Sequence, residues 1–139
     1  MSFREKSAWV MGSVMTVAGL WYLLTALEAS RATGWAPPPP GILPPYVILV
    51  AIASVIAQST LALLWPKQAD TRADEREAPL LDRAGNWAGL MLGGGAIGAL
   101  VNYMVHGSGD LLFHLIVGSL ILSQIAEYAL QILFFRRNG

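Results

Sequence analysis

Long apolar runs dominate the chain and lie at residues 8–27, 46–65, 87–105 and 111–135. A helix that crosses the roughly 30 Å hydrocarbon core of a membrane needs about 20 mostly apolar residues, and each run has about that length. None of the runs contains Lys, Arg or an internal proline. Backbone groups in lipid must be paired within their own segment. We therefore expect an all-α fold, an integral membrane bundle of four transmembrane helices that forms a single domain over residues 1–139.

The predicted helices are joined by segments of different character. The outer loop, residues 28–45, contains four consecutive prolines, which favour a polyproline II rod. It is either a stiff spacer or a docking surface for a partner, with Trp35 as the anchor. The charged loop, residues 66–86, interleaves acidic and basic residues and predicts a solvated connector whose helix is interrupted at Pro79.

The distribution of Lys and Arg predicts the orientation in the membrane, because cytoplasmic loops carry an excess of both. The N-terminal tail has two of these residues, segment 66–86 has four and the C-terminal tail has two, whereas loop 28–45 has one. Both termini and the charged loop should therefore face the cytoplasm, an N-in, C-in topology. Trp9, Trp65 and Trp87 would then lie at the cytoplasmic interface, where indole rings are enriched.

Composition narrows the function classes. Only 13% of the residues are charged, against about a quarter in soluble domains, and the nine acidic and nine basic residues cancel. This balance gives no global electrostatic case for nucleic-acid binding. Zero cysteines exclude disulfides, thiolate metal sites and thiol–disulfide catalysis. Because soluble-enzyme motifs are also absent, we expect neither an enzyme nor a cofactor.

The third run is rich in glycine at four-residue spacing. Its two ladders consist of Gly85, Gly89 and Gly93, and of Gly94 and Gly98 followed by Asn102. Small residues at this spacing let a neighbouring backbone approach closely, so the pattern predicts a packing helix. The neighbour is the fourth helix, the first helix or another subunit. Alternatively, the consecutive glycines 93–95 permit a bend or a partly unwound segment, as in transporters.

The fourth run contains a polar stripe formed by Ser123, Gln124, Glu127 and Gln131. At about 100° per residue these side chains fall within roughly a 100° arc, so they should face the protein interior. An ionisable group within a span is costly, so the position of Glu127 suggests a functional site. Its predicted partners are Gln124 or Gln131 on its own helix, or Ser54, Gln58 or Ser59 on the second. Three roles remain open: hydrogen-bonding between helices, proton or cation handling, and contact with a partner.

A second polar cluster is predicted at the outer membrane edge, from Asn102, His106, Asp110 and His114 around the turn between the third and fourth helices. These residues are too few and too loosely held for a metal, so no metal site is predicted. We expect hydrogen bonds that close the helical hairpin. The alternative is a pH-responsive histidine.

Two stretches, Phe-Arg-Glu-Lys-Ser-Ala-Trp-Val-Met at 3–11 and Asp-Glu-Arg-Glu at 74–77, resemble a group of small, uncharacterised bacterial four-span membrane proteins. In that group an acidic–basic run leads into a glycine-containing third span. The proline-rich loop and Pro79 depart from its pattern. The resemblance implies a location in the bacterial inner membrane and supplies no activity.

These observations favour a small, non-enzymatic membrane accessory or interaction protein that packs through its third helix. Its expected partners are membrane lipid and either further copies of itself or another membrane protein. The alternative is a small homo-oligomeric transporter or channel that uses Glu127.

Overall fold

The computed structural model describes residues 2–34, 43–69 and 77–138. Four long helices account for most of them: α1 (Phe3–Thr33), α2 (Leu43–Leu64), α4 (Ala78–His106) and α5 (Gly109–Asn138). A single turn, α3 (Pro66–Ala69), follows α2, and no strand occurs in the described part of the chain. Each long helix is long and apolar enough to cross a membrane, which confirms the predicted all-α fold with four spans.

The helices are longer than the predicted spans. At 1.5 Å per residue, the 31 residues of α1 extend about 46 Å, so this helix projects beyond the hydrocarbon core. The connector predicted at 66–86 is shorter, because α4 already begins at Ala78. Pro79 lies in the first turn of α4, where its missing N–H has no intrahelical partner to lose. It therefore starts this helix instead of interrupting one.

Local signals fix the helix ends. The Ser2 side chain accepts a hydrogen bond from the Glu5 backbone N–H at 3.2 Å and caps α1. Gly34 and Gly107, with φ of 74° and 68°, end α1 and α4 in the left-handed conformation that glycine tolerates best. Gly107 and Ser108 alone connect α4 to α5, so these two helices are antiparallel neighbours.

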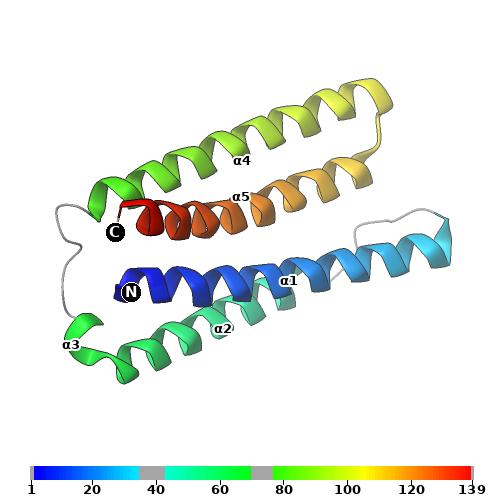
Figure 1. Cartoon of the computed structure of the whole chain (residues 1–139). Helices are drawn as coiled ribbons and strands as arrows, with labels where there is room; N and C mark the ends of the chain where they lie inside the picture. The colour runs from blue at the N-terminus through cyan, green and yellow to red at the C-terminus, as the bar shows by residue number, and fades with distance from the viewer. Residues whose placement is uncertain (1, 35–42, 70–76, 139) are drawn as a thin grey trace.

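The four long helices pack in the order α2, α1, α5, α4 (Figure 1). α5 contacts both α1 and α4, and α1 contacts both α5 and α2, so α2 and α4 form the two edges of the arrangement. Both chain termini lie at one end of the molecule, which we call the terminal end. We call the opposite end, where α4 turns into α5, the hairpin end.

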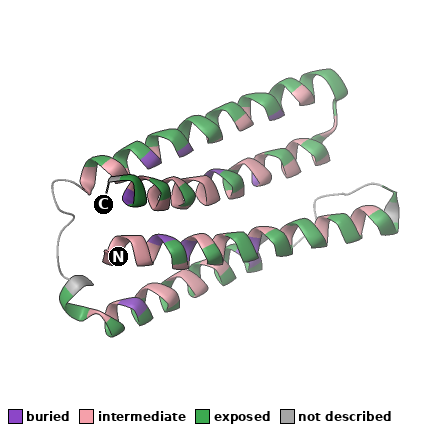
Figure 2. Ribbon diagram, viewed as in Figure 1, coloured by how far each residue is buried: buried purple, intermediate pink, exposed green. Residues whose placement is uncertain are grey.

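Close contacts between α5 and its neighbours depend on glycine. A Cβ atom built on Gly95 of α4 would lie 2.7 Å from the Ser119 Cβ of α5. A Cβ on Gly19 of α1 would lie 2.7 Å from the Ile121 Cγ2, closer than real Cβ contacts allow. The buried positions of α4 are all alanines: Ala84, Ala88 and Ala99. Figure 2 shows these buried positions on the side of α4 toward α5, while its other sides are mostly exposed.

Substituting Gly95 with Val should therefore destabilise the α4–α5 contact. Overpacking of this kind costs typically 1–3 kcal/mol, and unfolding of the purified protein in mixed micelles with increasing SDS measures it. Gly118→Val is the matched control, because a Cβ at Gly118 of α5 meets no atom within 4 Å. Equal stability of the two variants would contradict the assigned contact.

Candidate functional site

A polar concave surface lies between α4 and α5 near the terminal end. It is an open groove of about 690 Å³ lined by Leu81, Asp82, Gly85, Asn86, Glu127 and Gln131. We call it the polar groove. Two carboxyl groups and two carboxamides line it, and its six lining residues include no Lys or Arg. Such a surface suits a cation or a group that donates hydrogen bonds.

The predicted partnership between Glu127 and Gln131 is confirmed. The Gln131 Nε2 donates a hydrogen bond to the Glu127 Oε1 at 3.2 Å, as residues four apart on one helix face permit. Ser123 is buried, and Gln124, Glu127 and Gln131 are each partly exposed. The Ser123 hydroxyl donates to the backbone carbonyl of Leu120 at 2.9 Å. The polar stripe therefore uses local bonds, and its outer part opens on the polar groove.

The predicted contact of Glu127 with α2 is wrong. Gln58 of α2 instead pairs with Ser7 of α1: the Gln58 Nε2 donates to the Ser7 hydroxyl at 2.8 Å, and that hydroxyl lies 3.2 Å from the Gln58 Oε1. The reason is the helix order, since α2 packs on α1 and Glu127 faces α4. The groove places Glu127 beside Asn86, which directly precedes Trp87, so this carboxyl group lies at the depth where the span was expected to begin.

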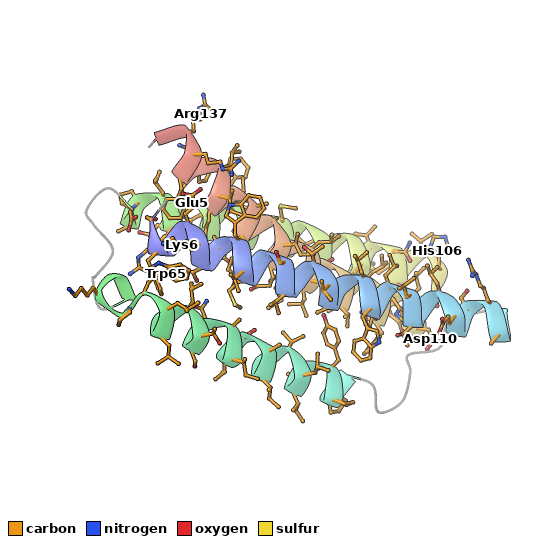
Figure 3. The ribbon with its side chains drawn as sticks, turned by 60° about the horizontal axis from the view of Figure 1, so that its bottom comes forward. Glu5, Lys6, Trp65, His106, Asp110 and Arg137 are labelled. Atoms are coloured by element: carbon orange, nitrogen blue, oxygen red, sulfur yellow. The ribbon has the colours of Figure 1, made fainter. Side chains whose placement is uncertain are left out.

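Charged and aromatic side chains gather at the terminal end, where Figure 3 shows Lys6 beside Trp65 and Arg137 pointing away from the helices. Three cations lie over aromatic rings: Lys6 over Trp65 at 4.1 Å, Arg136 over Trp9 at 5.3 Å and Arg83 over Phe134 at 5.3 Å. Two ion pairs add to these, Arg4 with Glu77 at 3.7 Å and Arg136 with Glu5 at 3.6 Å. Exposed ion pairs contribute little stability, so their main effect is to hold the helix ends in register.

The cluster predicted at the hairpin end is only partly assembled. The His106 ring bonds within α4, with its Nδ1 3.2 Å from the Asn102 carbonyl oxygen. The His114 Nδ1 instead lies 2.7 Å from the Tyr22 hydroxyl of α1. Figure 3 shows His106 and Asp110 at this end of the molecule. His114 thus links α5 to α1, a partnership that sequence spacing could not reveal because it depends on which helices are neighbours.

Aromatic rings surround this link. Tyr22 lies 5.9 Å from Tyr46 of α2, and Tyr46 stacks on Trp21 at 5.8 Å between ring centroids. The cluster therefore joins α1, α2 and α5. Among the described residues, no group of three or more His, Cys, Asp or Glu side chains is arranged to hold a metal ion.

The ladder glycines do not make the close contact with α5. A Cβ added at Gly85, Gly89, Gly93, Gly94 or Gly98 would meet no atom within 4 Å in the described structure. The contact with α5 uses Gly95 and the alanines one position away from the ladder residues, Ala84, Ala88 and Ala99. The close contact with the fourth helix therefore does not use the ladder glycines, although Gly85 lines the polar groove between α4 and α5. The α4 helix runs unbroken through residues 93–95, so the predicted alternative of an unwound segment there is wrong.

Comparison with known proteins identified no matching family model, no matching curated protein and no matching solved structure.

Replacing Tyr22 by Phe removes the hydroxyl that bonds to His114 and should lower the free energy of unfolding by about 0.5–1.5 kcal/mol. SDS unfolding in micelles measures the change. Tyr103→Phe, at the same end on α4, is the control, because no contact of its hydroxyl with a described residue is found. If His114→Phe and Tyr22→Phe destabilise additively in a double-mutant cycle, the bond does not couple α1 to α5.

Proposed function

We propose that this protein is a membrane accessory or interaction protein that associates with other membrane subunits through α4. One observation carries the proposal: a Cβ added at any of the five ladder glycines would have open space in the described structure, while other small residues make the contact with α5. A glycine inside a helix costs about 0.5–1 kcal/mol relative to alanine in soluble proteins. Nothing in the described fold of a single chain requires glycine at these five positions. A neighbouring helix from outside the chain would require glycine at those positions that face it.

The position of α4 supports this function. α4 is an edge helix that packs on α5 alone among the main helix contacts, so its remaining surface faces lipid or another protein. Leu90, Ile97 and Met104 on that surface are 67%, 65% and 84% exposed. Close approach at the glycines would cover these side chains in an assembly.

The finer location proposed is the inner membrane of a bacterium, with the terminal end in the cytoplasm. Arg4, Lys6, Lys67 and Arg83 belong to the helix ends at the terminal end, as do Arg136 and Arg137, whereas α1 brings only Arg31 to the hairpin end. This distribution supports the N-in, C-in topology under the positive-inside rule. The bacterial inner membrane follows from the sequence resemblance described above.

Bulky substitutions at the ladders test the association. Gly89→Leu and Gly98→Leu should release the assembly into single chains, as read by native mass spectrometry after gentle extraction. Gly118→Leu on α5, another glycine with open space around it, should leave the assembly intact. The proposal fails if the unmodified protein is extracted as a single chain without any partner, or if both α4 variants retain the full assembly.

A small transporter is the second candidate, supported by the two carboxyl groups of the polar groove. It predicts that Glu127→Gln abolishes cation or proton flux into proteoliposomes. Glu28→Gln, which alters a carboxyl group of α1 away from the groove, should leave flux unchanged. Full flux in the Glu127→Gln variant, or no flux in the unmodified protein, would remove this candidate.

A further inference from the structure

One face of α4 has the pattern of a seam between two helices. It consists of Asn86, Leu90, Gly93, Ile97, Leu100 and Met104, which we call the outward face of α4. These residues are all exposed and are spaced alternately by four and three positions. At about 100° per residue they lie opposite the alanines that contact α5. The same spacing forms the seam of parallel coiled coils, including those in membranes.

Asn86 is the one polar residue of the outward face. It is exposed and makes no hydrogen bond with the residues that the structure describes. Asparagine hydrogen-bonds across helices in membranes, and a single asparagine in an apolar seam fixes register and the number of helices. The position of Asn86 therefore points to a carboxamide partner on the neighbouring helix.

Charges at the start of the outward face are self-complementary. Asp82 and Arg83 are exposed and lie on opposite sides of the line through Asn86 and Gly93. In a parallel pair of helices related by a two-fold axis, each flank of one helix faces the opposite flank of the other. The Arg83 guanidinium lies over the Phe134 ring of α5 in the single chain, 5.3 Å from its centroid. On turning from that ring toward its own flank of α4, it would face Asp82 of the other copy, and the reverse pair would form as well. Such reciprocal contacts are what a two-fold interface requires.

We propose that a second copy of this chain docks on the outward face of α4 and forms a parallel two-fold dimer. The inference rests on the proposed function and names its partner. Gly93 allows close approach, the two Asn86 carboxamides bond to one another, and two Asp82–Arg83 pairs flank them. Asp82 and Asn86 also line the polar groove. The second copy would therefore cover the open side of the groove and place its Arg83 next to the carboxyl groups of the groove.

Disulfide crosslinking in native membranes tests the geometry, since the natural chain contains no cysteine. Ile97→Cys should form a covalent dimer with its own copy on mild oxidation, because seam side chains of a two-fold pair face each other. Val55→Cys on α2 is the matched control, since Ile97 and Val55 are both 65% exposed. We expect dimer formation at least tenfold faster for Ile97→Cys. Equal rates, or no dimer at Ile97→Cys, would overturn the proposal.

Charge exchange tests the flanking pairs. Asp82→Arg and Arg83→Asp should each weaken the dimer about threefold to tenfold, as read from its dissociation constant in micelles. The double exchange re-forms both pairs with their signs inverted and should restore the dimer. Asn86→Val should weaken the dimer by a similar factor. Failure of the double exchange to restore a dimer that both single variants weaken would argue against the two-fold arrangement.

The outcomes separate this inference from the proposed function. If the assembly contains a different protein, and Gly89→Leu releases it, the accessory function stands and the second-copy proposal is overturned. If the unmodified protein is monomeric and unpartnered in its membrane extract, both fail.

Discussion

Helices in a lipid bilayer gain little from covering one another's apolar side chains, because hydrocarbon tails are as apolar as leucine. Their association depends instead on close packing and on hydrogen bonds. In this protein α5 supplies side chains and its neighbours supply the glycines on which they pack: Ser119 lies against Gly95 of α4, and Ile121 lies against Gly19 of α1. The central position of α5 follows from this arrangement. The polar groove between α5 and α4 and the Tyr22–His114 bond between α1 and α5 both depend on these helix pairings.

Hydrogen bonds between polar side chains then determine which helices pack together, because apolar surfaces alone do not distinguish one helix from another. Most hydroxyls within the spans bond to the carbonyl four residues earlier on their own helix, as Thr16, Thr60 and Ser119 do, and so carry no information about the neighbour. The bonds between helices are few. Ser7 with Gln58 joins α1 to α2 near the terminal end, and Tyr22 with His114 joins α1 to α5 near the hairpin end. Together these bonds give α1 a fixed rotation against both of its neighbours.

The four membrane-length helices were predictable, since each comes from a continuous apolar run. The length and composition of such a run do not depend on which helices pack against it. The bond between Glu127 and Gln131 was predictable as well, because both residues lie on one helix. Partners on different helices were not, because spacing along one helix says nothing of the helix order. Gln58 is therefore among the partners that the sequence suggests for Glu127 although it bonds to Ser7, and His114 is expected at the hairpin although it bonds to Tyr22. Gly95 was indistinguishable from the other glycines of α4 until Ser119 was placed opposite it.

The two edges of the helix arrangement are not equivalent. The exposed side of α2 carries Ile48, Ile52, Val55 and Ile56, and the exposed hydroxyl of Thr60 bonds to its own helix, so this edge is mostly suited to lipid. The exposed side of α4 carries, in addition to apolar residues, a carboxamide at Asn86 and opposite charges at Asp82 and Arg83. These three residues precede the apolar run 87–105 and so lie where the span begins, and glycines flank them where side chains would otherwise hold a neighbour away. An edge with polar groups at one end and glycines beside them supports the proposal that another helix packs on α4.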